Sequence, residues 1–199
     1  FGPIGNERYI EYINDINRSG NYLLDLLEDV LSLSRMEAGG RELVREPVDI
    51  LEVIESTIVL LGQRGEKVRV HGSEPRMASA DPLGLKQVLV NVLDNALKYG
   101  GDRGVDVNVR CDEGGTVSVS VCDAGPGIAP EDLVHVTEPF YTGKRPATVT
   151  RPENSGTGVG LALSKRLIEG MEGRLTIDSE VGAGTCVCIS LAAAQQPVS

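Results

Sequence analysis

Polar side chains share one stripe of a predicted helix over residues 82–99. Gln87, Asn91, Asn95 and Lys98 are spaced by four, four and three residues, so a helix places them on one face. Amide oxygens can ligate Mg²⁺, and a lysine can bind phosphate as a point charge. The stripe therefore indicates one wall of a site for metal-bound phosphate, although a solvated helix face would also accept these residues.

A carboxylate ends a predicted strand. Alternation along residues 117–123 puts Asp123 on the same side as the valines that face the core. An inward carboxylate is costly unless a group donates a hydrogen bond to it, and the amino group of a purine would do so. Gly125 and Gly127 follow at once and would let the backbone approach a flat ligand closely. The alternative is that Asp123 only shapes a turn in the segment Asp-Ala-Gly-Pro-Gly.

A glycine-rich segment begins another predicted helix, over residues 158–172. Gly156, Gly158 and Gly160 punctuate its start, with Thr157 as a further donor. Backbone N–H groups at a helix start favour phosphate oxygens. The segment matches neither common nucleotide-binding fingerprint, because no strand leads into it and no Gly-Lys-Ser/Thr follows. By itself it is weak evidence for a phosphate site.

The loop before that helix, residues 141–155, is long for a compact domain. Lys144, Arg145 and Arg151 concentrate positive charge there in an otherwise acidic chain. Long loops in compact domains are commonly lids or disordered segments. The loop therefore predicts a lid that closes over polyphosphate, or else a merely solvated loop.

Hydrophobic periodicity predicts the elements that position these residues. They are a joint at residues 45–50 broken by Pro47, a helix over 49–65 capped by Asp49, strands at 67–72 and 77–80, a helix over 82–99 capped by Asp81, a hairpin of strands 105–112 and 116–123, the helix over 158–172, and a final hairpin of strands 174–180 and 185–192. Gly182, Gly184 and Thr185 are best explained as the turn of the last hairpin. The order predicts an α+β fold, a two-layer sandwich with one mixed sheet covered by helices on one face.

A long helix over residues 7–38 precedes this region. Its stripe follows the four-and-three spacing of a coiled coil or bundle. The stripe consists of Tyr9, Ile13, Ile16, Gly20, Leu23, Leu27, Val30 and Ser34. A rod of this kind cannot bury its stripe alone, so we expect partner helices from the preceding chain or from a second copy. Packing against its own domain is the alternative.

Composition excludes several classes of protein. Nineteen basic and 29 acidic residues give a net charge of −10, which argues against a general binder of nucleic acid or anionic membranes. No apolar run approaches the roughly 20 residues of a bilayer span, so we expect a cytoplasmic chain or the cytosolic part of a larger protein. The four cysteines contain no CxxC pair and are predicted mostly as small core residues in a reducing compartment.

Taken in order, these motifs resemble the N, G1, F and G2 boxes of the sensor histidine kinases of two-component systems. The matching segments are Asn-x-x-x-Asn-Ala-x-Lys-Tyr, Asp-x-Gly-x-Gly, Glu-Pro-Phe-Tyr and Gly-Thr-Gly-x-Gly-Leu, and the long helix ending in SLSRMEAGG resembles the second helix of the family's dimerisation hairpin. The resemblance implies a partial hairpin over residues 1–46. It implies an ATP-binding catalytic domain over residues 47–199, with the Bergerat-type fold that type II topoisomerases and mismatch-repair ATPases share.

The resemblance also implies ATP and Mg²⁺ as ligands. In the family, the residue matching Asn95 ligates the metal and the one matching Lys98 contacts phosphate; Asp123 would take the adenine amino group, with Tyr99 near the base. The remaining nucleotide contacts carried over by resemblance are Gly125, Gly127, Ile128, Phe140, Lys144, Gly156, Thr157, Gly158, Val159, Gly160, Leu161 and Thr185.

Asn91 occupies the position of a glutamate that activates water in the ATP-hydrolysing relatives. An amide cannot serve as that base, so ATP would survive until another nucleophile arrives. Asn91, Asn95 and Lys98 would then be the catalytic residues, acting through positioning and charge neutralisation. A true ATPase is a further alternative, which Asn91 and the heptad helix both oppose.

The activity that the resemblance implies is transfer of the γ-phosphoryl group of ATP to a histidine, and then to an aspartate of a response-regulator receiver domain. The family dimerises through its hairpin, and we expect no nucleic-acid partner and no direct membrane contact. The cytosolic part would then belong to a bacterial sensor, which can be membrane-anchored. A pseudokinase or a histidine-phosphotransferase-like scaffold is the alternative.

Two features depart from the family pattern. Thr137 stands where the F box usually begins with a second aromatic residue, so lid packing is expected to be looser. The phosphoacceptor histidine is missing, because His71 ends a predicted strand and His135 lies in the loop before the F box. We therefore expect a fragment that begins after the first hairpin helix.

Overall fold

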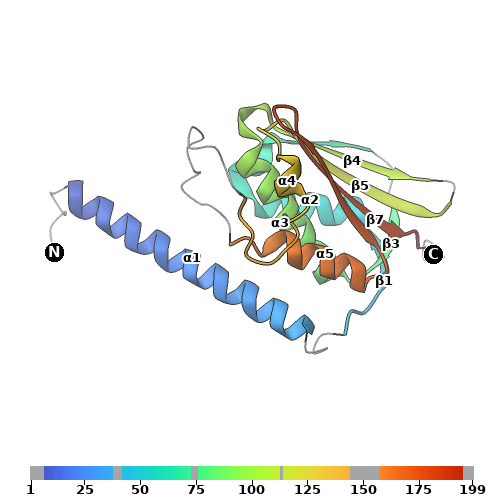
Figure 1. The fold of residues 1–199 in the computed structure, drawn as a ribbon. Coiled ribbons are helices and arrows are strands. Elements are labelled where there is room, and N and C mark those ends of the chain that lie inside the picture. Colours follow the sequence, from blue (N-terminus) through green and yellow to red (C-terminus); the bar gives the residue numbers. More distant parts are fainter. Residues whose placement is uncertain (1–6, 38–41, 73–75, 113, 144–156, 195–199) are drawn as a thin grey trace.

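The structure is a computed structural model of the chain and describes residues 7–37, 42–72, 76–112, 114–143 and 157–194. The long helix α1 (Glu7–Glu37) is confirmed; it contacts α5, and its N-terminal part projects away from the rest of the molecule (Figure 1). Its predicted stripe is exposed: Tyr9 is 58%, Leu23 64% and Leu27 57% accessible. This single chain therefore leaves the stripe uncovered, and packing of the stripe against its own domain is not observed.

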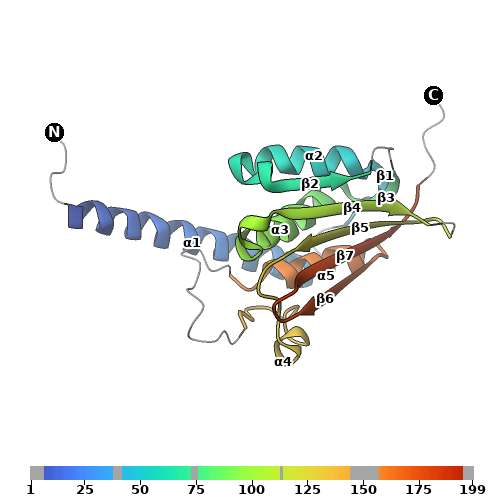
Figure 2. The ribbon, with the colours of Figure 1, turned by 90° about the horizontal axis from the view of Figure 1, so that it is seen from above.

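Five strands form the main sheet in the order β2-β4-β5-β7-β6, which Figure 2 shows side by side. They are β2 (Val68–His71), β4 (Val105–Cys111), β5 (Thr116–Asp123), β7 (Gly184–Ala192) and β6 (Arg174–Glu180). β2 pairs with β4 in parallel, and the other pairs are antiparallel. Both predicted hairpins and the mixed sheet are confirmed.

A second, two-stranded sheet occupies the segment predicted as a joint. β1 (Glu46–Asp49) pairs antiparallel with β3 (Met77–Ala80). Pro47 interrupts helix as expected, but a strand that pairs on one side only tolerates the missing N–H. The prediction of a plain joint at residues 45–50 is therefore wrong.

Three helices cover one face of the main sheet: α2 (Ile50–Leu60), α3 (Pro82–Tyr99) and α5 (Gly160–Gly170). The Asp49 side chain caps α2 by accepting from Leu51 N at 2.9 Å, and Asp81 caps α3 by accepting from Gly84 N at 2.7 Å. Short helices complete the described elements: η1 (Gly62–Lys67), η2 (Gly101–Arg103) and α4 (Pro130–Leu133).

Alternation along the strands builds the core between these two layers. The valines of β5 and the apolar residues of β7 point toward the helices; Val119, Val121 and Ile189 are at most 1% accessible. In α3 the buried stripe includes Val88 and Leu89, both fully inaccessible. The α+β two-layer sandwich predicted from the order of elements is confirmed.

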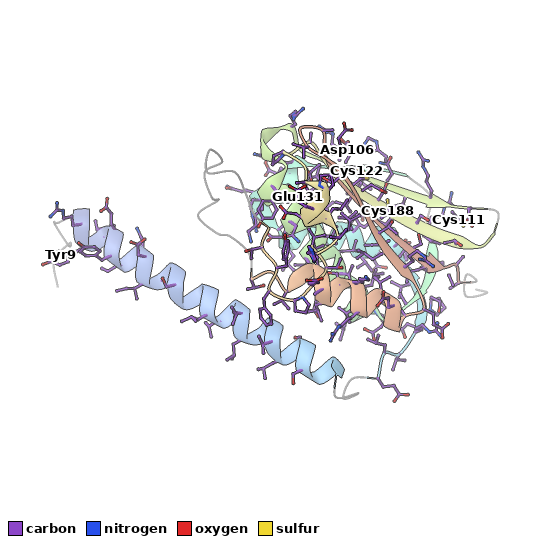
Figure 3. The ribbon with its side chains drawn as sticks, viewed as in Figure 1. Tyr9, Asp106, Cys111, Cys122, Glu131 and Cys188 are labelled. Atoms are coloured by element: carbon purple, nitrogen blue, oxygen red, sulfur yellow. A yellow bond between two sulfur atoms is a disulfide. The ribbon has the colours of Figure 1, made fainter. Side chains whose placement is uncertain are left out.

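The prediction for the cysteines is wrong. Cys122 and Cys186 form a disulfide between β5 and β7, Cys188 is partly exposed and Cys111 is exposed. The physical reason is alternation: Val121 and Val187 take the core side, so their neighbours Cys122 and Cys186 take the opposite face of the sheet. Figure 3 labels Cys111, Cys122 and Cys188 on the strands.

Candidate functional site

The C-terminal half of α3 is where the predicted motifs converge. Gly100, just after the helix, lies against Asp123, since a Cβ built on it would be 2.8 Å from the Asp123 Cβ. The middle of the helix contacts the start of α5, because Asn91 Nδ2 donates to Gly160 O at 3.2 Å. Two segments from distant parts of the sequence therefore flank the amide-bearing helix.

Asp123 is half-buried at the end of β5. Its Oδ1 accepts a hydrogen bond from Gly125 N at 2.8 Å. Burial raises the pKa of the Asp123 carboxyl above its usual value, and hydrogen bonds from the backbone N–H groups of Gly125 and Thr185 oppose that rise. The alternative that Asp123 shapes a turn is therefore correct for its Oδ1 atom, which accepts from Gly125 N. A carboxylate has two oxygens, so this does not exclude a ligand.

The glycines after Asp123 have a structural reason that the sequence did not reveal. A Cβ on Gly125 would overlap the Tyr99 carbonyl oxygen, and a Cβ on Gly127 (φ +71°) would overlap the Glu180 carbonyl oxygen. Close approach of protein backbone therefore already requires glycine here. The sequence prediction attributed these glycines to a flat ligand, with a turn as the alternative, and neither anticipated these backbone contacts.

Asn91 connects α3 to α5 through hydrogen bonds. Besides Gly160 O, its Nδ2 donates to Ser164 Oγ at 3.4 Å, and Ser164 Oγ donates to Gly160 O at 2.8 Å. Ser164 is fully buried. Sequence reasoning missed Ser164, although a serine on the apolar face of a predicted helix, four residues after a glycine, was a usable signal.

Asn95 and Lys98 lie on the last turns of α3. Asn95 is partly exposed, and no hydrogen bond joins its amide to the residues that the structure describes. Lys98 Nζ lies 3.1 Å from Asp94 Oδ2, and Arg64 Nη1 lies 2.7 Å from Asp94 Oδ1. The lysine is therefore already neutralised in part by its own helix.

The start of α5 presents backbone donors. Its N-cap residue, Val159, has no side-chain capping bond. Thr157 Oγ1 accepts from Val159 N at 3.3 Å, and Phe140 N donates to Gly158 O at 2.9 Å. Gly158 has φ +74°, so the helix begins at Gly160, two residues later than predicted. Leu161 follows in its first turn.

Two predicted site residues, Lys144 and Gly156, lie outside the described residues, as do Arg145 and Arg151. The segment just before them is described. The Tyr141 hydroxyl donates to the buried Asp132, whose carboxylate raises the pKa of Tyr141 to about 12. Sequence reasoning missed this pair.

Thr185 joins the site through Ser179, another residue that sequence reasoning missed. Ser179 Oγ accepts from Ile128 N at 2.9 Å, donates to Gly184 O at 2.8 Å, and lies 2.9 Å from Thr185 Oγ1. Period two from Leu175 puts Ser179 on the core-facing side of its strand, which was the available signal. The interpretation of Gly182, Gly184 and Thr185 as a hairpin turn is correct for Gly182 alone, because Gly184 and Thr185 are the first residues of β7 and pair with Glu180 and Ser179.

The two histidines lie at the surface. His71 Nε2 is 2.9 Å from Asp106 Oδ1, which Figure 3 labels on the sheet, and His135 Nδ1 is 2.9 Å from Glu138 Oε1. Across the described segments, no group of three or more histidine, cysteine or carboxylate side chains could hold a metal ion. A bilayer-spanning helix, long and apolar enough, is also absent from those segments.

Comparison with known proteins gives a family and several relatives. A sequence model of the family described as histidine kinase-, DNA gyrase B- and HSP90-like ATPase matches residues 80–195. The Non-motile and phage-resistance protein of Caulobacter vibrioides is 39% identical, with 96% of this chain and 23% of that protein covered. The Cell-division control histidine kinase PdhS of Brucella canis is 35% identical, with 94% and 19% covered.

A solved structure also resembles this one. It is full-length ShkA in complex with AMPPNP, with a TM-score of 0.76 and 30% identity, covering 97% of this chain and 41% of that chain. The chain thus spans about a fifth of the length of the curated relatives it matches.

Proposed function

Because the chain belongs to the family of histidine kinase-, DNA gyrase B- and HSP90-like ATPases, we propose that residues 47–199 bind Mg²⁺ and ATP as the catalytic domain of a protein-histidine kinase. Residues 1–46 would supply the second helix of the dimerisation hairpin. The observation that most supports this proposal is that two segments flank the amide-bearing helix α3. Asp123 lies beside Gly100, and the start of α5 lies beside Asn91. Nine residues of helix (100 − 91) span about 13 Å, which suits an extended nucleoside triphosphate.

The residues fit the two ends of that ligand. At the base end, the half-buried Asp123 would accept from the adenine amino group, beside Tyr99 and the backbone of Gly125 and Gly127, with Ile128 and Thr185 completing this end. Burial strengthens such a charge-assisted bond because water competes less for the carboxylate. The half-buried carboxylate therefore supports a purine with an exocyclic amino group.

At the phosphate end, the uncapped start of α5 supports anion binding. Gly158, Val159, Gly160 and Leu161 would donate through their backbone, and Thr157 would add its hydroxyl. Phe140 would lie beneath the lid, from which Lys144 and Gly156 would contact the phosphates. Lys98 would meet phosphate by sharing its charge between the ligand and Asp94.

The Asn95 amide oxygen is a ligand of the type that Mg²⁺ binds. Because this amide is partly exposed and has no hydrogen bond to the described residues, it would be able to coordinate the metal. The metal would neutralise phosphate charge. Asn91 would hold α5 in place rather than activate water, so attack would await the imidazole of a histidine on another segment.

The wider activity is supported by a relative that is named a histidine kinase. We infer transfer of the γ-phosphoryl group to a histidine outside this chain, and then to an aspartate of a response-regulator receiver domain. The exposed stripe of α1 supports a homodimer through a helical hairpin. The net charge of −10 supports the absence of a nucleic-acid partner, and we place this region in the cytoplasm. A pseudokinase has no feature in its favour.

One experiment tests the proposal directly. The chain, Mg²⁺ and ATP labelled at the γ-phosphate would be mixed with a separate polypeptide that carries the histidine-bearing helix of a histidine kinase. We expect label that is acid-labile and alkali-stable on that polypeptide, as phosphohistidine is, and none when its histidine is alanine. Nucleotide binding without any such label would contradict kinase function.

Substituting Asn91 by glutamate is expected to raise slow ATP hydrolysis. The new carboxylate could activate water, although it would lose the hydrogen bond to Gly160 O. Phosphate release measured with Mg²⁺ and ATP checks this. Asn91→Ala is the matched control, because it also removes the bond but adds no base. Equal phosphate release by both variants would contradict the argument that Asn91 slows hydrolysis because an amide cannot activate water.

ATP affinity is expected to fall as pH decreases through the raised pKa of Asp123. Only the deprotonated carboxylate accepts from the adenine amino group, and burial sets its pKa above the ordinary 3.8. Folding shows the opposite sign: the carboxyl's stabilising contribution is present below 3.8 and is lost as pH rises through the raised pKa. Calorimetric titration at several acidic pH values checks the first effect. Asp123→Asn protein should lack the part of the pH dependence that comes from this carboxyl. An identical pH profile of ATP affinity in both proteins would contradict the role of Asp123.

A further inference from the structure

A disulfide lies next to the proposed adenine end of the site. Cys122 and Cys186 are directly opposite partners in the β5–β7 ladder, with their Cα atoms 4.0 Å apart at a sequence separation of 64. They form the last rung of that ladder. The next residue of β5 is Asp123, and the residue before Cys186 in β7 is Thr185.

The same depression in the surface contains both the disulfide and the site residues. Cys122 and Cys186 line it together with Asp123 and Thr185, and it is open to solvent. Both cysteines are partly exposed, so a small reductant is expected to reach the disulfide. Alternation places the sulfurs on the outer face of the sheet, so they are adjacent to the proposed ligand contacts without being part of them.

We propose that Cys122 and Cys186 form a thiol–disulfide exchange site, whose opening loosens the strand ends that hold Asp123 and Thr185. A thiolate of an external thiol attacks one sulfur and forms a mixed disulfide, and a second thiolate releases it. Overall, two external thiols are oxidised to one disulfide, and the protein disulfide takes up two electrons and two protons to become two cysteine thiols. The effect on ligand binding rests on the proposed function; the exchange itself does not.

Neither of the free cysteines is suited to open the bond from within. Cys188 is two residues along the same strand, but burial raises the pKa of its thiol, with Asp178 adding to the rise. A protonated thiol is a poor nucleophile. Cys111 lies at the far end of β4, at the hairpin that leads into β5. The reductant must therefore come from outside the chain.

The ladder explains why opening matters for Asp123. Beyond the Cys122–Cys186 rung, β5 and β7 have no further paired residues, yet Gly184 at the start of β7 is packed against the Asp123 carbonyl oxygen. Once the covalent link is gone, only hydrogen bonds hold the final rung, and strand ends open locally before the core does. Asp123 and Thr185 would then be held less firmly.

The test uses Cys111→Ser/Cys188→Ser protein, in which every remaining thiol belongs to the pair. Thiols are counted under denaturing conditions before and after dithiothreitol, and amide hydrogen exchange is measured over residues 120–126 and 183–188. We expect no thiols before and two per chain after treatment. Exchange should become faster in both segments, and the melting temperature should fall by about 5 °C or more. Two thiols before treatment, or unchanged exchange, would overturn the proposal.

Titration with Mg²⁺ and ATP in both states then measures the link to the site. We expect affinity about tenfold weaker after reduction, as for a binding group displaced by a fraction of an ångström, and restored on reoxidation. Cys122→Ser/Cys186→Ser protein should bind like the reduced form and ignore dithiothreitol. Equal affinity in both states would overturn the link to the site. Absence of ATP binding in both states would overturn that link together with the proposed function, while the thiol counts would still decide the exchange site.

Discussion

Replacing Asn95 with alanine is expected to abolish the Mg²⁺-dependent part of ATP binding. The alanine removes the amide oxygen that we assign to the metal, and Mg²⁺ in phosphate sites has only one or two protein ligands beside waters and phosphate oxygens, so the loss of one removes most of the protein's hold on it. Without the metal, the charges of the phosphates are left to Lys98 and the α5 N-terminus. Titration of ATP with Mg²⁺ and with a chelator measures the effect: the native protein should show a large difference, and the variant none.

Gln87→Ala is the matched control for that experiment. Gln87 carries an amide on the same stripe of α3, two turns before Asn95, and has no proposed ligand contact. Its replacement should leave the metal dependence intact. If Asn95→Ala retained the native difference between the Mg²⁺ and chelator titrations, the metal assignment would be wrong.

Replacing Asp123 with asparagine is expected to weaken ATP binding by about 2–4 kcal/mol, because a charge-assisted hydrogen bond is lost. The substitution is conservative for the fold: an asparagine oxygen can still accept from Gly125 N, as Oδ1 does now at 2.8 Å. A loss of ATP affinity in this variant would therefore be due to the missing negative charge and not to a changed turn. Calorimetry or competition with a fluorescent nucleotide measures it, with thermal unfolding to verify the fold.

Asp178→Asn is the matched control here. Asp178 lines the same depression as Asp123, but it is exposed and opposite Cys186 on the outer face. Its replacement should leave ATP affinity unchanged. The native protein should also prefer ATP to GTP, since guanine presents a carbonyl oxygen where adenine presents the amino group. Equal affinity for the two nucleotides would contradict the role of Asp123.

Local patterns in the sequence predicted most of the elements and the candidate site. The 3.6-residue stripe of α3 and its cap Asp81 are properties of adjacent residues, and so is the alternation that turned Asp123 inward. The order of the four motifs then predicted the nucleotide site that we propose, because each motif lies at an element boundary that sequence reveals. The elements are confirmed for the described residues, while the ligand contacts of the individual site residues stay predictions.

Partners across the fold could not be predicted in the same way. Alternation indicated the face on which a side chain lies but not which strand lies beside it, so the Cys122–Cys186 disulfide was missed. The β1–β3 sheet was missed for the same reason, as Pro47 interrupts helix whether or not a strand pairs with it.

The sequence by itself determined the kinds of most elements and the chemistry that we propose for the site, because hydrophobic periods, caps and motif order are encoded within a few residues. Only the tertiary structure decided that Asn91 holds the start of α5 through Gly160 and Ser164, that Gly125 packs on the Tyr99 carbonyl, and that Ser179 links Ile128 to Thr185. The contacts of Asn91 and Gly125 join residues 26 to 73 positions apart (125 − 99 and 164 − 91). The contacts of Ser179 connect β6 to β7 and to the loop that follows β5. They form only when strand pairing and helix packing bring those positions together, and no local pattern specifies that choice.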